Sequence, residues 1–567
     1  MLGWGCSVFS GSASILLPGK EEIQFPKSGS SAAGGIIAST PEPRTIPTLS
    51  HPFLRIPPFP DAASKYFVRA SGPSADIEAI AAQLKRLRVG GYYWGVQPPL
   101  PADYVLVASI SALDYAKRIS EGRTVVFYDR ETDPWHMLTN ASALVAEAGD
   151  ELRIVAALVG CPCIELDGET AKDGPETRDI SEMLAQEFGG FFENPFTGEA
   201  MNALEAIELC GFWRELIDSN RDIVGGLGFA FWKKRHVAPL LWGGGDPFKF
   251  IRNAASIGPG ARVAVWRSKV PLETTAELNA AGAVLIEVED GFLRSRGLGA
   301  DCVPPLSIIV DRLGVYFDPS RESELERLLE AEVFNDALLK RARELRTLIL
   351  AAGLGKYDRG QSVLDRPAGE RCHILVPGQV EDDRAVTLGG CGLLSNLELI
   401  RRVRERAPQA YILYKPHPDV VAGHRRGAIA QSSCLEYADE IVGDVPISSL
   451  ISMVDEIHVN TSLAGFEALL REKSVTTYGV PFYAGWGLTI DLGPVPGRRT
   501  AKRSIDELVS AALLLYPRYF DPVTGLPCPA EVVIRRLTEG KEPDASLVVG
   551  LRRVQGKLMR RLRSLVQ

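Results

Sequence analysis

The chain has 567 residues, 46% of them hydrophobic, which is more than one hydrophobic core usually serves. We therefore expect two or three domains. The formal net charge of -8 and the sequence pI of about 5.6 argue against a general nucleic-acid binder, because contacts to phosphates would need a dominant basic face. Nucleic acid is accordingly excluded as a partner.

The nine cysteines are scattered along the chain. The closest pair, Cys161 and Cys163, has no second Cys or His pair to complete a zinc site, so we interpret the cysteines as reduced, cytosolic and mostly structural. The N-terminus lacks the features of a signal peptide, and no later stretch approaches the ~20 apolar residues that span a bilayer. These features predict a soluble or peripheral protein.

Residues 1–65 are rich in Ser, Gly and Pro without helical or strand periodicity, which predicts a flexible leader. From about residue 90 onward, short apolar runs alternate with amphipathic stretches, a pattern typical of parallel sheets covered by helices. The predicted fold class is therefore α/β. Strands are expected at 281–289, 305–311, 372–377, 410–416, 455–460 and 474–479, and helices at 321–354, 395–407, 462–473 and 504–516.

An internal repeat is visible in two pairs of segments. Residues 134–163 can be laid over 446–475 with matching apolar periodicity, and residues 194–209 over 521–536 with a sharper match. The first copy has no EDG sequence and no suitably placed HP pair, and it has Ala148 and Gly149 where the second has Thr461 and Ser462. We therefore interpret it as part of a module that has lost its chemistry. The alternative is that two parallel-sheet units resemble each other through composition alone.

Two carboxylates, Glu289 and Asp290, end an apolar strand immediately before Gly291. Open α/β sheets bind their ligands at this end of a strand, and either side chain is a candidate general acid or base. Arg294 and Arg296 follow and could hold an acidic sugar or pair with neighbouring acids. An isolated EDG sequence is equally compatible with a solvated turn.

A second acidic segment, QVEDDR at 379–384, follows the strand expected at 372–377. Alone it is a weak signal, because acidic loops are common and mostly solvated. Together with Glu289 and Asp290 it supplies the second carboxylate that a two-step displacement requires.

His417 lies between two prolines in the sequence YKPHPD, and these prolines restrict the backbone so that the imidazole is held in place. Beside Lys415, a fixed imidazole suits contact with a phosphate or its leaving oxygen. A lone His is more often structural, but this context favours a functional role.

Thr461 and Ser462 open the third of the expected helices, so their hydroxyls and the free backbone N–H groups there form a candidate anion site. Plain N-capping is the alternative. Five residues on, Glu467 could accept hydrogen bonds from ribose hydroxyls. Tyr483 and Trp486 are candidate walls of a pocket, although packing explains them equally well.

The last segment, residues 546–567, carries several Arg and Lys residues without an acidic one, and its leucines recur at helical spacing. This pattern predicts a basic amphipathic helix that lies on anionic lipid. The alternative is a solvated terminal helix packed on the body of the protein.

Seven stretches together resemble the β-Kdo transferases of bacterial capsule assembly, the KpsC/LpsZ type. They are residues 289–300, 304–326, 376–383, 414–419, 459–470, 478–489 and 515–525, and the match extends over roughly 190–540. The EDG, HP and hydroxyl-pair motifs are also similar to those of bacterial sialyltransferases, which use CMP-linked keto-acid sugars too.

The resemblance implies a GT-B-like pair of Rossmann-like domains with the site in the cleft between them. Typical full-length members carry two complete modules, whereas this chain matches one complete module preceded by a degenerate partial repeat, so we expect one active site. The expected domains are a flexible leader (1–65), the partial repeat (66–190), the acceptor-side N-terminal domain (191–370), the CMP-sugar-binding C-terminal domain with returning helices (371–545) and the basic tail (546–567).

The resemblance also implies CMP-β-Kdo as donor and a lipid-linked oligosaccharide acceptor at the cytoplasmic face of the inner membrane. The expected protein is cytoplasmic and peripheral at that membrane surface. Other capsule synthesis or export proteins are further candidate partners. No cofactor or metal ion is expected, because CMP carries a single phosphate.

A β-linked donor and a β-linked product require net retention, most simply through a covalent sugar–carboxylate intermediate. By position in the family motif, the resemblance implies that Asp383 is the nucleophile, with Asp382 as the alternative. Glu289 or Asp290 would then act as the general acid/base. The candidates for holding the donor are Lys415, His417, Thr461, Ser462, Glu467, Gln379 and Arg294.

Two other functions are compatible with the sequence. One is a transferase for another CMP-activated acidic sugar, such as a sialic-type nonulosonate. The other is a catalytically idle partner that binds the acceptor or organises capsule assembly. The complete motif set of the second module argues against the idle partner, because decay like that of the first copy would be expected there.

Overall fold

A computed structural model describes residues 15–16, 49, 51–62, 66–72, 76–167, 170–173, 177–252, 254–293, 303–353, 366, 369–423, 425–443 and 445–540. The chain divides into two compact units. Unit 1 is Met1–Arg221 with Trp242–Pro247, and unit 2 is Asp222–Leu241 with Phe248–Gln567. Arg294 and the predicted tail at 546–567 lie outside the described residues, so what was predicted for them stays a prediction.

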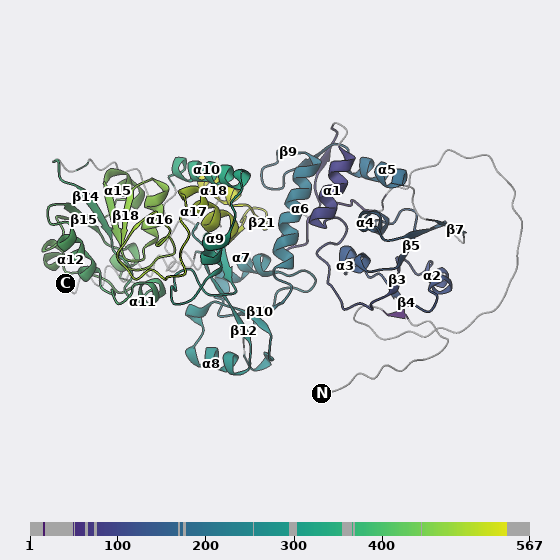
Figure 1. The fold of residues 1–567 in the computed structure, drawn as a ribbon, viewed down its shortest axis with the longest axis horizontal. Coiled ribbons are helices and arrows are strands. Elements are labelled where there is room, and N and C mark those ends of the chain that lie inside the picture. Colours follow the sequence, from purple (N-terminus) through teal and green to yellow (C-terminus); the bar gives the residue numbers. More distant parts are fainter. Residues whose placement is uncertain are drawn as a thin grey trace, which may run out of the picture. The chain divides into compact units, whose positions relative to one another are not determined.

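Unit 1 is built around a mainly parallel sheet with the strand order β1-β4-β3-β5-β6-β7, in which only β7 runs antiparallel to its neighbour (Figure 1). The strands of unit 1 are β1 (Ile15–Leu16), β2 (Arg69–Ala70), β3 (Tyr104–Val107), β4 (Thr124–Phe127), β5 (Ala143–Glu147), β6 (Cys163–Asp167), β7 (Thr170–Asp173), β8 (Phe191–Glu193) and β9 (Ala200–Met201). Of these, β2, β8 and β9 form a separate sheet. Its helices are α1 (Ile77–Leu87), α2 (Leu113–Ile119), α3 (Pro134–Thr139), α4 (Leu152–Val159), α5 (Thr177–Phe188) and α6 (Ala203–Asp218).

Part of the predicted leader is folded into unit 1, so the prediction of a flexible segment up to residue 65 is wrong for residues 53–59. Phe53, Ile56 and Phe59 are buried, and the Arg55 guanidinium pairs with Glu151. The ring of Phe59 packs edge-on against Trp213 and Trp242. The prolines of this segment suggested disorder, but its apolar side chains bury enough surface to fix it in place.

The first domain of unit 2 has a mixed sheet with the order β10-β11-β12-β13-β20-β21, in which β10, β11 and β12 are parallel. Its strands are β10 (Ile223–Leu227), β11 (Arg262–Val265), β12 (Val284–Asp290), β13 (Ser307–Asp311), β20 (Pro517–Phe520) and β21 (Pro527–Cys528). Its helices are α7 (Phe231–Leu241), α8 (Leu272–Ala280), α9 (Glu324–Ala331), α10 (Asp336–Ala351), α17 (Ile505–Val509) and α18 (Ala530–Glu539). Val237, Ile286 and Ile308 belong to its buried core.

The second domain of unit 2 has a fully parallel sheet with the order β16-β15-β14-β17-β18-β19. Its strands are β14 (His373–Pro377), β15 (Tyr411–Lys415), β16 (Glu440–Ile441), β17 (Glu456–Val459), β18 (Ser474–Thr477) and β19 (Ile490–Asp491). Its helices are α11 (Arg384–Gly389), α12 (Asn396–Arg406), α13 (Pro418–Val421), α14 (Gln431–Leu435), α15 (Ile447–Met453) and α16 (Leu463–Leu470). The predicted α/β class, with two Rossmann-like domains in this unit, is confirmed.

Two of the expected helices are interrupted. The helix expected at 321–354 is divided into α9 and α10, because Asn335 adopts an extended conformation and caps α10 with its side chain. The helix expected at 504–516 begins as α17 and continues as a π-helix over Ser510–Leu515. The chain then returns through β20 and β21 to the first sheet of unit 2.

The division between the units falls after Arg221, whereas the sequence placed a domain boundary at residue 190. The reason is local: β8 pairs with β2, and α6 packs on α1, so residues 191–218 complete unit 1. Hydrophobic residues of α6 such as Ile207 and Trp213 are fully buried there.

The sharper of the two predicted repeat matches folds into the same hairpin turn in both units. In unit 1 the Asn194 side chain accepts hydrogen bonds from the backbone N–H groups of residues 196 and 197, and in unit 2 the Asp521 side chain accepts from residues 523 and 524. Gly198 and Gly525 follow, each with a φ of 74° and each donating its N–H to the carbonyl of that same Asn or Asp. A helix begins a few residues after each turn, α6 in one unit and α18 in the other.

The longer repeat match also folds alike. Residues 134–163 form α3, β5, α4 and the start of β6, and residues 446–475 form α15, β17, α16 and the start of β18 in the same order. At the start of the second helix of each copy, Asp150 accepts the N–H of Leu152 and Ser462 accepts the N–H of Ala464. The predicted match of Gly149 to Ser462 is therefore off by one residue: Asp150 holds this place, so a carboxylate stands in unit 1 where unit 2 has a neutral hydroxyl.

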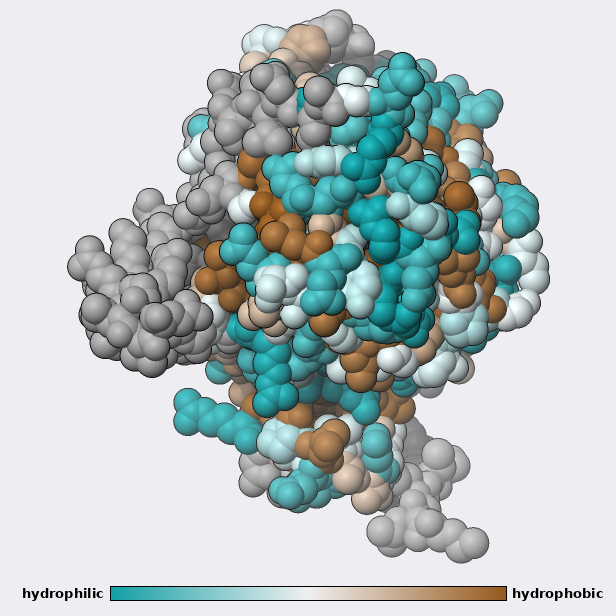
Figure 2. Space-filling model, turned by 90° about the vertical axis from the view of Figure 1, so that its left-hand side faces the viewer, coloured by the Kyte–Doolittle hydropathy of each residue, from teal (hydrophilic) through white to brown (hydrophobic). Residues whose placement is uncertain are grey.

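The face of unit 2 that carries the second domain is mainly hydrophilic, with hydrophobic residues scattered over it (Figure 2). Among the described residues, no helix combines the length and apolar character needed to cross a membrane. Peripheral attachment through residues 546–567 remains a prediction.

Candidate active site

The polar groups predicted to bind the donor follow three neighbouring strands of the second domain. Lys415 ends β15 and His417 follows it, Gln379 follows β14, and Thr461 follows β17; β14 lies between the other two strands. The predicted nucleophile, Asp383, also follows β14. Because the chain turns to one side of β14 toward β15 and to the other toward β17, the gap between β14 and β17 is the switch point where open α/β sheets bind ligands.

Gln379 and Thr461 hold two of these strand ends together. The Gln379 amide nitrogen donates to Thr461 Oγ1 at 2.9 Å, and the Thr461 backbone N–H donates to Gln379 Oε1 at 2.9 Å. The sequence predicted both as donor-binding residues. Their reciprocal bonds fix the spacing between the loops after β14 and β17.

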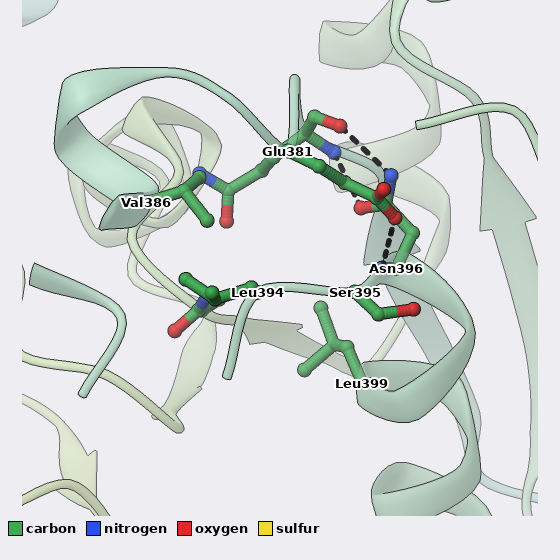
Figure 3. A pocket seen from close by; sticks show the side chains of 8 residues that line it. Glu381, Val386, Leu394, Ser395, Asn396 and Leu399 are labelled. Carbon is green, nitrogen blue, oxygen red and sulfur yellow. Dashed lines mark hydrogen bonds between the residues drawn. The ribbon is translucent and has the colours of Figure 1, made fainter. Parts of the chain in front are cut away.

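Asn396 clamps the loop that leads from β14 to Asp383, a role that the sequence analysis missed. Its side chain accepts the N–H of Gln379 at 2.8 Å and donates to the carbonyls of Gln379 and Gly427, while its own N–H donates to Glu381. Figure 3 shows Glu381 and Asn396 joined in this way beside a small pocket. In the sequence, the pair Ser395–Asn396 was a signal only of the start of the amphipathic helix α12.

Asp383 is the N-cap of α11 and accepts the N–H of Ala385 at 2.9 Å. The cap fixes the carboxylate at the end of the β14 loop. The neighbouring Asp382 is half-exposed and pairs with the Arg425 guanidinium at 3.2 Å. The two candidate nucleophiles therefore have different surroundings.

His417 caps the short helix α13, and its Nδ1 accepts the backbone N–H of Asp419 at 3.1 Å. With Nδ1 as an acceptor, a neutral imidazole carries its proton on Nε2, which suits donation to an anion. Lys415 is buried at the end of β15, where its Nζ donates to the carbonyl of Gly443 at 2.8 Å.

We expect His417→Ala to weaken binding of CMP by about tenfold or more, since it removes a donor to a charged phosphate. A substitution by Asp separates capping from phosphate binding, because Asp is a good N-cap but repels an anion. Isothermal titration with CMP should therefore rank His417→Asp below His417→Ala. If Asp instead restores CMP binding, the imidazole serves the helix cap alone.

Ser462 caps α16, and the Tyr483 hydroxyl holds its backbone in place by donating to the Ser462 carbonyl. Tyr483 and Trp486 are both fully buried, so they are not exposed walls of a pocket. Burial raises the pKa of Tyr483 well above its usual value, which keeps the phenol protonated as a donor. The predicted ribose acceptor Glu467 lies buried on α16.

Gly465 gives Tyr483 this position, because a Cβ at residue 465 would lie 2.2 Å from the Tyr483 hydroxyl oxygen. We expect Gly465→Ala to destabilise unit 2 by about 2 kcal/mol, the usual cost of overpacking. In a double-mutant cycle read by chemical denaturation, Tyr483→Phe should recover part of that loss, since it removes the clashing oxygen. Additive losses would show that the clash is relieved elsewhere.

Glu289 and Asp290 lie on opposite faces of β12, as successive strand residues must. Asp290 pairs with Lys233 of α7 at 2.9 Å, within its own domain. Glu289 accepts the Arg384 guanidinium at 3.1 Å, and Arg384 directly follows Asp383 in the second domain. Of the two candidate acids, Glu289 is therefore the one that faces the β14 loop.

Glu287 extends this charged cluster, and the sequence analysis did not single it out. Its side chain is 4% exposed, and it accepts the guanidinium groups of Arg267 at 2.9 Å and Arg321 at 3.0 Å. Arg384 lies 3.6 Å from its second oxygen. In the sequence, the only sign that Glu287 and Glu289 share a face was their spacing, because residues two apart in a strand point to the same side.

Aromatic packing joins the two domains of unit 2 beside these charges. Phe292, directly after the EDG sequence, contacts Phe482 with ring centroids 4.6 Å apart and Phe466 at 6.1 Å. Tyr316 packs edge-on against Phe482. The contacts place the end of β12 against α16 and the loop after β18.

The predicted site residues thus fall into two groups. Gln379, Asp383, Lys415, His417, Thr461 and Ser462 share the strand-end edge of the second domain, and Glu289 reaches that domain through Arg384. Asp290 is turned toward Lys233, and the role of each residue remains a prediction. In the part of the chain that the structure covers, no group of three or more His, Cys, Asp or Glu side chains is arranged to hold a metal ion.

Two Rossmann-like domains with carboxylates on one side and phosphate-suited groups on the other define unit 2 as a GT-B-like module. Residues 261–519 match the family described as capsule polysaccharide biosynthesis protein. This match confirms the resemblance to the KpsC/LpsZ type found in the sequence.

Curated relatives from two bacterial species are similar to the chain. The capsule polysaccharide modification protein LipA of Neisseria meningitidis serogroup B is 37% identical over 373 residues, covering 64% of this chain and 53% of LipA. The lipopolysaccharide-processing protein LpsZ of Rhizobium meliloti is 48% identical over 239 residues, covering 41% of this chain and 54% of LpsZ. The chain therefore spans about half the length of the curated relatives it matches.

A solved structure, the β-Kdo 2,7 transferase of Thermosulfurimonas dismutans KpsC, is 36% identical to this chain, with a TM-score of 0.47. The match covers 56% of this chain and 100% of that one. The β-Kdo 2,4 transferase of the same KpsC is 32% identical, with a TM-score of 0.49, and the match covers 56% of this chain and 98% of the other.

Proposed function

We propose that this protein is a retaining glycosyltransferase that moves β-Kdo from CMP-β-Kdo to a lipid-linked, Kdo-bearing acceptor in capsule synthesis. The observation that carries the proposal is the Arg384–Glu289 ion pair, which brings a carboxylate of β12 to the residue after Asp383. The sequence identity to Kdo transferases and to capsule modification proteins supports the choice of sugar and pathway.

In the first step, the Asp383 carboxylate attacks the anomeric carbon of the donor. A bond forms between that carbon and an Asp383 oxygen, and the bond from the carbon to the phosphate oxygen breaks, so that CMP leaves as an anion. Asp383 suits this role because its backbone is fixed by the helix cap and by Asn396 through the preceding loop.

The groups around the β14–β17 gap suit the departing phosphate. His417 offers the Nε2 proton, Lys415 offers its ammonium, and the Thr461 hydroxyl lies at the edge of the same gap. Cationic and hydrogen-bonding groups at this place would stabilise the charge that develops on the leaving oxygen. This arrangement makes no demand for a cofactor.

In the second step, a hydroxyl of the acceptor attacks the same carbon and breaks the sugar–Asp383 bond. Its proton passes to Glu289, which we prefer over Asp290 because Glu289 faces the second domain. Two inversions at one carbon give net retention.

Incubation of the purified protein with CMP-Kdo and a synthetic Kdo-bearing phospholipid tests the proposal, with mass spectrometry of the lipid product. Addition of one Kdo residue is the expected result. Parallel reactions with CMP-sialic acid separate Kdo transfer from transfer of another CMP-activated nonulosonate. Absence of product with both donors would leave the non-catalytic capsule assembly partner as the better explanation.

A further inference from the structure

We propose that Arg384 recognises the carboxylate that an ulosonic donor sugar carries on its anomeric carbon. The inference rests on the proposed function and deepens it, since it names the residue that would select keto-acid sugars over sugars without a carboxylate.

The position of Arg384 beside the predicted nucleophile suits this role. In a 2-keto sugar acid the carboxylate is bonded directly to the carbon that the nucleophile attacks. A group that binds this carboxylate must therefore lie immediately beside the nucleophile. Arg384 is the residue after Asp383, at the first position of α11, and its guanidinium reaches across to β12.

The present partners of Arg384 show that its position suits a carboxylate. Its Nη1 donates to Glu289 at 3.1 Å, and the guanidinium lies over the Phe317 ring at 5.0 Å from the centroid. Arg384 is 26% exposed, so an incoming anion can reach it. A planar guanidinium can donate hydrogen bonds to both oxygens of one carboxylate, which would fix the orientation of the sugar as well as balance its charge.

Glu287 offers Arg384 a second partner when the donor arrives. The Oε2 atom of Glu287 is buried, has no hydrogen-bond partner among the described residues and lies 3.6 Å from Arg384 Nη1. A small movement of Arg384 toward Glu287 would release Glu289 and make this missing bond. Binding of the donor would thus remove the Arg384 hydrogen bond from Glu289, the predicted acceptor of the proton.

The charges around β12 show that Arg384 is not needed to neutralise Glu287. Three guanidinium groups, those of Arg267, Arg321 and Arg384, contact Glu287 and Glu289. Asp318 lies 3.9 Å from Arg321 and adds a third carboxylate, so the positive and negative charges of this cluster are equal in number. Arg267 and Arg321 continue to neutralise Glu287 when Arg384 is replaced, so the fold should tolerate the substitution.

The test compares the wild type with Arg384→Gln, Arg384→Lys and the control Arg425→Gln, which removes a guanidinium from the surface pair with Asp382. Binding of CMP-Kdo and of CMP alone is measured by isothermal titration, with thermal unfolding as a check on the fold. We expect Arg384→Gln to weaken CMP-Kdo binding by about 10–100-fold and CMP binding by less than about twofold. Arg384→Lys should fall between, because it keeps the charge and loses the fork.

Equal weakening of CMP and CMP-Kdo, or no weakening of either, would overturn the assignment of Arg384. The acceptor also carries a Kdo carboxylate, so kinetics at varied acceptor distinguish the two sources. A rise confined to the KM for the acceptor would overturn the donor assignment. Because binding is read without turnover, failure of the wild type to transfer Kdo would count against the proposed function and leave the comparison between CMP-Kdo and CMP interpretable.

Discussion

Asp383→Asn is expected to lower kcat for Kdo transfer by at least about a thousandfold, the scale of loss seen when an enzyme loses its nucleophile. Asn caps a helix about as well as Asp, so α11 should keep its start and the β14 loop its path. The amide cannot form the sugar ester, and the loss should therefore appear in kcat while CMP binding stays near the wild-type value. Product formation and titration with CMP measure the two quantities.

Asp382→Asn is the matched control, since Asp382 lies one residue earlier in the same loop and pairs with Arg425. It should keep activity within about threefold of the wild type. A reversed order, with Asp382→Asn inactive and Asp383→Asn active, would transfer the role of nucleophile to Asp382. Wild-type activity in both variants would exclude a covalent intermediate on this loop.

The strand-end residues were predictable because a parallel sheet aligns the carboxyl ends of its strands. Each of Gln379, His417 and Thr461 follows an apolar run that periodicity identifies as a strand, and the order β15-β14-β17 then brings them to one edge. The sequence left the choice between Glu289 and Asp290 open, because a strand pattern gives the alternation but not which face meets the other domain.

The supporting residues could not be found in this way. Asn396 acts through a buried hydrogen-bond pattern with backbone groups of distant loops, which no local pattern encodes. Nothing in the sequence distinguishes Glu287 from the other acidic residues, and only the structure shows the guanidinium groups around it. Residues 53–59 were misjudged for a related reason: composition suggested disorder, whereas partners far along the chain, such as Trp213, bury them.

The repeat offers a physical reason for the prediction that unit 1 has lost its donor site. At the start of α4, Asp150 occupies the place that Ser462 has at α16. A carboxylate there satisfies the helix N-terminus internally and repels a phosphate, which a neutral hydroxyl does not. The helix is present in both copies because either side chain accepts an N–H group of its first turn. The fold can therefore be kept even where the side chain no longer suits an anion.

The second large effect that we expect is a loss of stability at the hairpin turn of the repeat in unit 2. Asp521 is fully buried, and Arg536 donates to both of its carboxylate oxygens at 2.8 and 3.0 Å. We expect Asp521→Ala to destabilise unit 2 by about 3–5 kcal/mol, because it removes the main carboxylate partner of a buried guanidinium together with the turn's acceptor. Urea denaturation, followed by a signal from unit 2, measures the free energy of unfolding.

The first copy of the repeat provides the control, since the matching positions of unit 1 hold Asn194 and Leu209. Asp521→Asn keeps the turn acceptor but leaves the Arg536 charge without its carboxylate, so it should still be clearly destabilising. Adding Arg536→Leu removes that charge and introduces the apolar side chain that unit 1 has at this position. The double variant should therefore be more stable than Asp521→Asn alone. A double variant less stable than the single one would show that Arg536 stabilises this region through contacts other than Asp521.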